Sequence, residues 1–234
     1  MSPADLLLRV PDPADCQALG FHLERLLALD KAAAVRIVGV GPVAAVYSAP
    51  PLHGSTSKGS AVAVLAVRTL ALAAGSEPFD RTVAAGRLLD ALAKLEKHER
   101  PDANGSGGRL VPVPEPLVGG PSWAGLLPPR SGWRPADPIP VVQLAEAVAQ
   151  GNSDFRFAAL GRDRAGLDSL AEEIWTRELP GGLRWRSAHA ASAMGFLGPD
   201  PARSDALARL AAHSRWLRLD APYGTVLERT AGLE

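Results

Sequence analysis

The sequence predicts an α+β protein of two domains: an N-terminal sheet with helices on one face, and a C-terminal helical domain that ends in a β-hairpin. Three observations support this fold class. Short β-branched runs alternate with helical segments over residues 1–100, a Pro/Gly-rich tract fills the middle, and helical periodicity dominates after residue 140. With 234 residues and 47% hydrophobic side chains, the chain can bury one large core or two small ones.

The N-terminal domain opens with a predicted strand at residues 6–10 and a helix. Asp12 suits the N-cap of this helix because its side chain can accept a hydrogen bond from an unpaired backbone amide. Pro13 suits the first helical position, where no amide donor is needed. The apolar stripe that follows includes Cys16 and predicts a helix that ends near Leu29.

A hairpin and a buried strand come next. The β-branched runs at residues 35–40 and 43–47 are separated by Gly41-Pro42, which favours a turn. Small and branched apolar residues alternate over residues 61–72, as expected of a long buried strand. Asp80 then predicts the N-cap of a second helix that runs to about His98.

The middle of the chain has a different composition. Ten of the 21 prolines and seven glycines lie in residues 101–140, so we expect no helix and no central strand there. A tract of this kind is typical of a link between domains. We therefore predict domains at residues 1–100 and 138–234, joined by a Pro/Gly-rich linker at residues 101–137.

The C-terminal domain is predicted to contain helices at residues 140–150, 166–179, 185–197 and 204–213. Residues 216–219 and 225–228 then form a hairpin around a turn that contains Pro222 and Gly224. Three helices followed by a hairpin is the element order of a winged helix, in which the last helix enters the DNA major groove.

This topology makes four arginines candidate nucleic-acid contacts: Arg203, Arg209, Arg215 and Arg218. The charge of the region does not favour DNA binding. Residues 163–234 hold nine arginines and lysines against ten acidic residues, and phosphate neutralisation dominates affinity for nucleic acid. Packing or partner contact is the stronger interpretation of a winged-helix-like domain here.

The run from Trp123 to Trp133 is distinctive because two tryptophans bracket a Pro-Pro turn and Arg130. Trp and Arg are typical of binding hot spots, so Trp123, Arg130 and Trp133 are candidate partner contacts. The alternative is that the tryptophans form a clasp that pins this segment to the two domains, since each can bury roughly 200 Å².

This run and the C-terminal residues 216–227 resemble an uncharacterised family of two-domain actinobacterial proteins, over most of the chain. The resemblance implies a two-domain architecture. It carries no activity and no site residues, because the shared motifs have no known chemical role.

Composition excludes several other classes. The 25 basic residues balance the 25 acidic ones, so no global field steers the chain towards nucleic acid or an anionic membrane. Cys16 is the only cysteine, so the chain holds no internal disulfide, and we expect a buried, inert thiol. The N-terminus lacks a signal-peptide pattern and no apolar run reaches membrane-span length, which predicts a cytoplasmic protein with no membrane partner.

No motif predicts catalysis, a cofactor or a metal. A phosphate-loop-like segment at residues 54–59 has the wrong order of residues. His22 and His53 lack ligand partners at metal spacing, and His189 shares an apolar stripe with Trp185, as in a packed core. The leading hypothesis is a non-catalytic interaction or regulatory protein with an unknown protein partner. The alternatives are a DNA-binding regulator and an enzyme with a site at the domain boundary.

Overall fold

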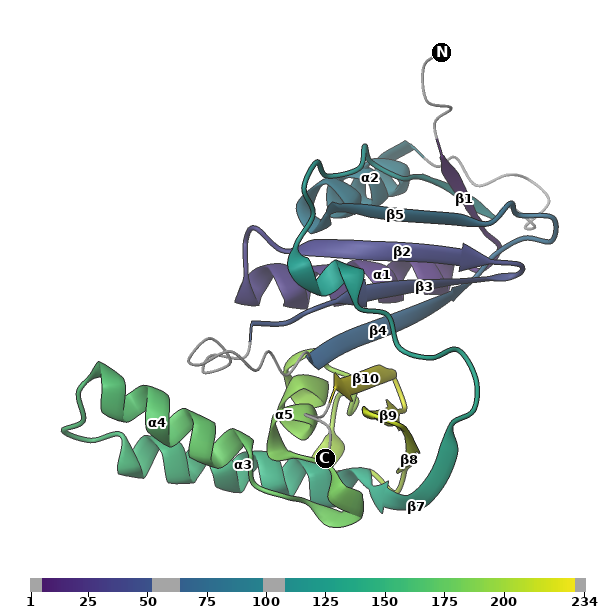
Figure 1. Cartoon of the computed structure of the whole chain (residues 1–234). Coiled ribbons are helices and arrows are strands. Elements are labelled where there is room, and N and C mark those ends of the chain that lie inside the picture. The colour runs from purple at the N-terminus through teal and green to yellow at the C-terminus, as the bar shows by residue number, and fades with distance from the viewer. Residues whose placement is uncertain (1–5, 52–63, 99–107, 230–234) are drawn as a thin grey trace. The chain divides into compact units, whose positions relative to one another are not determined.

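The computed structural model describes residues 6–51, 64–98 and 108–229 (Figure 1). Its contacts divide the chain into two compact units, each of which is made of two separate segments of the sequence. Unit 1 comprises Met1–Ala49 and Val67–Leu126, and unit 2 comprises Pro50–Ala66 and Leu127–Glu234. Each unit contains a strand, a helix and then at least three further strands, so the predicted mixed α+β class is confirmed.

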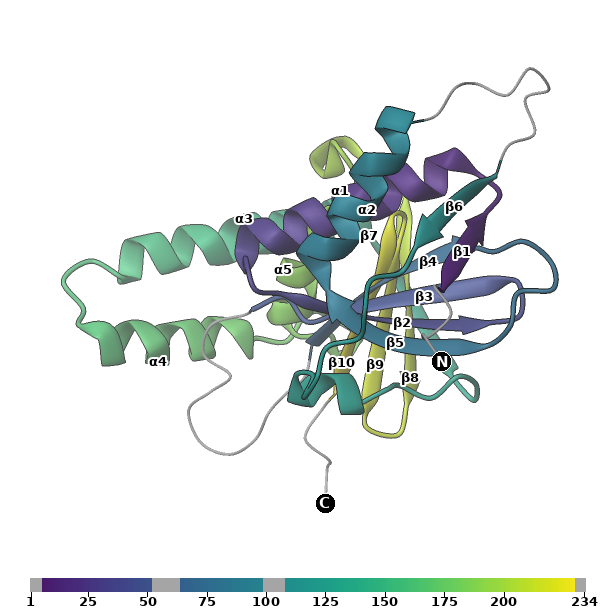
Figure 2. The same cartoon turned by 90° about the horizontal axis from the view of Figure 1, so that it is seen from above.

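Unit 1 carries two helices against a sheet whose strand order is β5-β2-β3-β4, with β1 and β6 paired separately as an antiparallel ribbon. The first three residues of β4 are grouped with unit 2. Figure 2 shows α1 and α2 on the same face of these strands. The elements are β1 (Leu7–Val10), α1 (Pro13–Leu29), β2 (Ala34–Val40), β3 (Val43–Ser48), β4 (Val64–Ala71), β5 (Phe79–Ala84), α2 (Ala85–His98), β6 (Arg109–Pro112) and η1 (Ser122–Gly125).

The local signals at the start of unit 1 act as predicted. The Asp12 carboxylate accepts a hydrogen bond from the Ala14 amide at 2.8 Å and caps α1, which begins at Pro13. Gly41 has a φ of +57°, the conformation that the tight β2–β3 turn requires. The buried stripe of α1 contains Cys16, as predicted.

The predicted start of the second helix is wrong. Asp80 does not cap a helix, because residues 79–84 form strand β5, which pairs antiparallel with β2. The Asp80 carboxylate instead accepts a hydrogen bond from Arg36 Nε at 2.8 Å. Val83 is buried as a strand residue, and α2 begins only at Ala85.

The segment after β6 lies on the face of the unit 1 sheet opposite α1 (Figure 1). The Leu117 amide donates a hydrogen bond to the Thr82 carbonyl at 2.8 Å. Further along, Arg36 donates from its guanidinium to the Ala124 carbonyl within η1. Part of the predicted linker is therefore packed on unit 1.

Unit 2 has a four-stranded antiparallel sheet in the order β10-β9-β8-β7, together with three α-helices. The Glu228 side chain of β10 bonds to Ser187 of α5, which joins this helix to the sheet. The elements are β7 (Arg134–Pro140), α3 (Val141–Ala158), α4 (Arg164–Trp175), η2 (Pro180–Gly182), α5 (Trp185–Ala193), η3 (Pro201–Arg203), β8 (Leu207–His213), β9 (Trp216–Ala221) and β10 (Gly224–Arg229).

The winged-helix prediction is wrong because its third helix does not exist. Residues 207–213 form β8, which pairs with β7 on one side and β9 on the other. Ala208 and Leu210 are buried while Leu207 and Arg209 are exposed, which is the two-residue alternation of a strand. Pairing with two neighbours overrides the helical preference of these Ala and Leu residues. The final hairpin, β9–β10, is confirmed.

The proline-rich tract also forms strands, but only at sheet edges. β6 ends in Pro112 and pairs with β1 alone, and β7 contains Pro135 and Pro138 at the end of the unit 2 sheet. A missing amide donor is tolerated at an edge, so the expectation of no central strand is confirmed for the described part of the tract, residues 108–140. The glycine-rich run at residues 104–107 lies outside the described residues.

Candidate functional site

A buried histidine in unit 1 fastens α1 to the sheet. His22 is only 2% exposed, and its Nε2 lies 3.1 Å from Ser48 Oγ on β3. Burial, aided by the positive charge of Arg68, lowers the pKa of His22 to about 3. The ring is therefore neutral near pH 7. Because it is enclosed by the core, it positions α1 and offers no atom to a substrate.

A buried carboxylate performs a similar task in unit 2. Glu228 of β10 is fully buried, and Ser187 Oγ donates a hydrogen bond to its Oε2 at 2.7 Å. Burial raises the pKa of Glu228, while the Ser187 hydroxyl and the nearby Arg184 and Arg186 oppose this shift. Arg184 Nε lies 3.7 Å from Glu228 Oε1.

The same network reaches α4. Arg186 donates a hydrogen bond to Glu172 Oε1 at 3.0 Å, so the buried Glu228 of β10 is linked through α5 to α4. Ser187 is 1% exposed, and a serine that no substrate can reach cannot act as a nucleophile. These residues hold unit 2 together.

The His189 side chain is packed, as predicted. Its ring stacks on Trp185 with 4.7 Å between ring centres, and burial lowers the pKa of His189. Trp185 Nε1 donates a hydrogen bond to the Ala147 carbonyl of α3 at 2.8 Å. Gly151 permits this close approach, because a Cβ there would lie 2.3 Å from Trp185 Nε1.

No group of three or more His, Cys, Asp or Glu side chains in the described part of the chain could hold a metal ion. No helix among the described residues is long and apolar enough to cross a membrane. The phosphate-loop-like segment at residues 54–59 and His53 lie outside the described residues.

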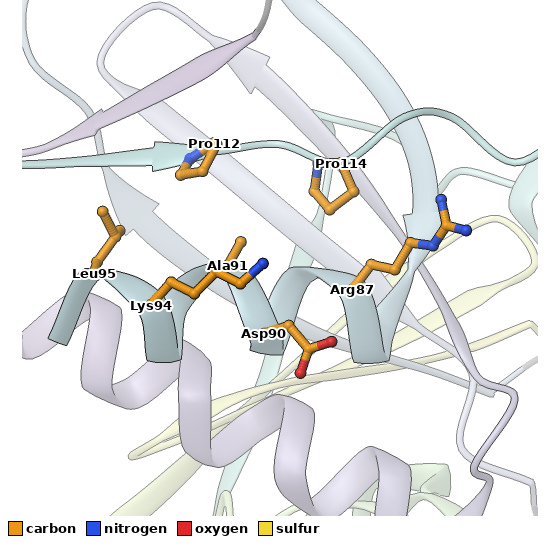
Figure 3. Close-up of a pocket in the computed structure, with 7 residues that line it drawn as sticks. All are labelled: Arg87, Asp90, Ala91, Lys94, Leu95, Pro112 and Pro114. Atoms are coloured by element: carbon orange, nitrogen blue, oxygen red, sulfur yellow. The ribbon is translucent and has the colours of Figure 1, made fainter. Parts of the chain in front are cut away.

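An open groove among the described residues of unit 1 is a candidate ligand site. It has a volume of about 420 Å³ and lies between α2 and the strand β6 with the residues that follow it. Figure 3 shows Ala91 and Leu95 of α2 directed towards Pro112 and Pro114 across the groove. The residues that line it are Arg87, Asp90, Ala91, Lys94, Leu95, Pro112 and Pro114.

The helical wall of the groove combines an apolar stripe with a charged rim. Ala91 and Leu95 lie one turn apart on α2 and are half-buried. Arg87, Asp90 and Lys94 are exposed, and they follow one another at helical spacing along the same side of α2 (Figure 3). The helix therefore offers apolar contact at the floor and charges of alternating sign above it.

The strand wall of the groove is unusual in its backbone. The Val113 amide bonds to the Leu6 carbonyl, and Val111 is paired with Leu8, so the amides of these odd-numbered residues point towards β1. The backbone groups of residues 110, 112 and 114 alternate with them, so they point to the opposite edge, which does not face β1. Two of these three are prolines, so most amide donors are missing from that edge.

The three candidate partner-contact residues have different surroundings. Trp123 is half-buried in η1 of unit 1. Trp133 is half-buried in unit 2, where its Nε1 donates a hydrogen bond to the Pro129 carbonyl at 2.9 Å. Arg130, in the same short turn, is exposed. Their role in partner contact stays a prediction.

The four candidate nucleic-acid arginines do not share an α-helix. Arg203 lies in η3, Arg209 on β8, Arg215 in the β8–β9 turn and Arg218 on β9. The Arg218 guanidinium pairs with Asp220 at 2.8 Å and sits 5.8 Å from the centre of the Trp133 ring. The helix that would have presented these residues to a major groove is absent, which removes the physical basis of the prediction.

Sequence reasoning missed the groove. Its strand wall lies within the run Leu110-Val111-Pro112-Val113-Pro114, whose prolines indicated a linker. The alternation of buried valines with prolines was the available signal, because a period of two is typical of an edge strand. Recognising β6 as a strand would have identified one wall of the groove, but its position beside α2 is a tertiary contact that no local pattern predicts.

Two family models match the chain. Residues 4–107 match a domain of unknown function, DUF8010, and residues 128–233 match a second one, DUF8185. No curated protein matches the sequence.

Solved structures show a fold relationship. DNA polymerase III subunit beta from Pseudomonas aeruginosa aligns with a TM-score of 0.50 and 12% identity, covering 98% of this chain and 66% of its own. A DNA polymerase sliding clamp from the same organism aligns with a TM-score of 0.49 and 12% identity, and the alignment covers 97% of this chain and 64% of the clamp. The C. crescentus beta sliding clamp aligns with a TM-score of 0.45 and 11% identity, and the alignment covers 97% of this chain and 65% of that clamp.

Identity of this order shows similarity of fold alone, and this chain spans just under two thirds of the length of the first of these subunits. The structural neighbours are sliding clamps and not winged-helix proteins, in agreement with the strand at residues 207–213. The chain thus matches models of two domains of unknown function, DUF8010 and DUF8185, and its mixed α+β structure is similar in fold to a sliding-clamp subunit.

Proposed function

We propose that the chain is a non-catalytic, cytoplasmic interaction module that binds a segment of a partner protein in the groove between α2 and β6. The groove carries this proposal because it combines an apolar floor, a charged rim and a volume of about 420 Å³. That volume accommodates two or three apolar side chains, as in peptide-recognition grooves of other proteins.

Two further observations support a binding function over a catalytic one. Two buried titratable groups, His22 in unit 1 and Glu228 in unit 2, are enclosed by the core and bond to Ser48 and Ser187. The fold is similar to that of a sliding-clamp subunit, and such a likeness supports an interaction role without naming a partner.

A photo-crosslinking amino acid at Arg87, on the rim of the groove, provides the first step of the test. A partner trapped from this position is purified, and its affinity for the wild-type chain is measured by titration. The Ala91→Trp variant then decides the question, because its indole fills the floor beside Leu95. We expect affinity to fall at least tenfold.

The matched control is Ala93→Trp. Ala93 lies on the same helix, is exposed and does not line the groove, so this variant makes the same change in size outside the site. We expect it to bind the partner as the wild-type chain does. Equal affinity of the wild-type and Ala91→Trp chains for the trapped partner would contradict the proposal.

A further inference from the structure

The two walls of the groove restrict the conformation and the charge of its occupant. We propose that the groove receives an amphipathic α-helix of a partner protein, with an acidic residue at each end of its contact face and a basic residue between them. This inference rests on the proposed function and specifies the partner segment.

The strand wall disfavours an extended occupant. A strand added to an edge needs donors and acceptors at every second residue of that edge. On the free edge of β6 and the residues that follow it, these positions are Leu110, Pro112 and Pro114, and the two prolines have no amide to donate. A helix satisfies its own backbone hydrogen bonds, so it can pack against this wall through side chains alone.

The floor suits the apolar stripe of a helix. Ala91 and Leu95 form the apolar side of the helical wall, and Pro112 and Pro114 face them from the strand wall (Figure 3). The small Ala91 side chain leaves room for a large residue of the occupant. Apolar side chains at positions i, i+3 or i+4, and i+7 of a partner helix would fill such a channel over two turns.

The rim specifies the charges. Arg87, Asp90 and Lys94 occupy positions i, i+3 and i+7 of α2, so the backbone positions of the two basic residues lie about 10.5 Å apart along the helix axis at 1.5 Å per residue. The complementary pattern is acid, base, acid over the same two turns. Because the pattern is nearly symmetric, it fits a helix that runs in either direction along α2.

The experiment displays a library of designed amphipathic helices on phage and selects it against the full chain at low salt. The apolar face is constant, and each of three flanking positions carries either Glu or Lys. We expect Glu–Lys–Glu helices to be enriched about tenfold over Lys–Glu–Lys helices, from exposed ion pairs of modest strength.

A charge-reversed chain, with Arg87→Glu, Asp90→Lys and Lys94→Glu, provides the matched comparison, with far-UV circular dichroism to verify its fold. It should invert the ranking and enrich Lys–Glu–Lys helices. The same ranking on both chains would refute the charge pattern.

The Ala91→Trp chain separates the two proposals. If all charge patterns are enriched equally on the wild-type chain and are lost on Ala91→Trp, the groove binds helices but the inferred charge pattern is wrong. If Ala91→Trp retains the same helices as the wild-type chain, the groove itself is not the binding site and the proposed function fails.

Discussion

The burial of His22 makes a quantitative prediction about pH. In the folded chain the pKa of His22 is about 3, against 6.5 for an exposed histidine. The His22 ring of the unfolded chain therefore binds a proton below pH 6.5, whereas the ring in the folded chain stays neutral down to about pH 3. Stability conferred by the neutral ring is present above pH 6.5 and is lost as pH falls through this window. At 1.36 kcal/mol per pKa unit, the loss is about 2 kcal/mol by pH 5.

The assay compares the wild-type chain with His22→Gln by urea denaturation at pH 7, 6 and 5. The Gln amide can still bond to Ser48 Oγ but cannot take up the proton. We expect the variant to be less stable at pH 7, because its side chain fills the His22 site less well. The difference should shrink by about 2 kcal/mol at pH 5.

Two results would contradict a neutral, buried His22. Parallel pH dependence of stability in the two chains would show that His22 does not titrate differently on unfolding. A proton NMR titration in which the His22 ring changes charge near pH 6.5 in the folded chain would show that it is not held neutral. A loss of about 2 kcal/mol matters, because domains of this size are stable by only about 5–15 kcal/mol.

Two further predictions concern unit 2. Gly151→Ala should lower the melting temperature in a calorimetric scan, because its Cβ would clash with Trp185. We expect the free energy of unfolding to fall by about 1–3 kcal/mol. An unchanged melting temperature would contradict the packing of α3 on α5. Glu228 binds its proton more tightly in the folded chain, so its contribution is present below pH 4.5 and is lost as pH rises through its raised pKa. Glu228→Gln should therefore flatten the stability profile of unit 2 above pH 4.5, measured by hydrogen exchange of β10, and an unaltered slope would contradict the raised pKa.

Much of unit 1 could be predicted because local chemistry decides it. Asp12 and Pro13 define the start of α1 through a cap and a missing donor, and Gly41 defines a turn through its positive φ. Each signal acts within a few residues of the chain. The same kind of signal failed at Asp80, where pairing with β2 and the hydrogen bond from Arg36 outweigh the capping preference.

Residues 207–213 were mispredicted for a related reason. The sequence Leu-Ala-Arg-Leu-Ala-Ala-His favours a helix by local propensity, yet it pairs on both sides as β8. A short apolar run of this length is ambiguous, since helix and strand periodicity both fit it. The strands that pair with β8 decide between helix and strand. One of them, β7, ends at Pro140, far from Leu207 in the sequence, so no local pattern could identify it.

The groove could not be derived from either wall alone. The sequence around Pro112 and Pro114 indicated a linker, and the residues of α2 were predicted only as part of a helix that ends near His98. The groove exists because β6 pairs with β1 and lies beside α2, which brings the two walls together. The candidate residues Trp123 and Trp133 were chosen for their chemistry, whereas the groove depends on juxtaposition.

Binding at the groove can be mapped by hydrogen exchange of the chain with and without a selected Glu–Lys–Glu helix. A helix bound between α2 and β6 should slow exchange for the amides around Ala91 to Leu95 and for residues 110–113, with little change in unit 2. Protection confined to the sheet or helices of unit 2, with unaltered exchange along α2 and β6, would contradict it.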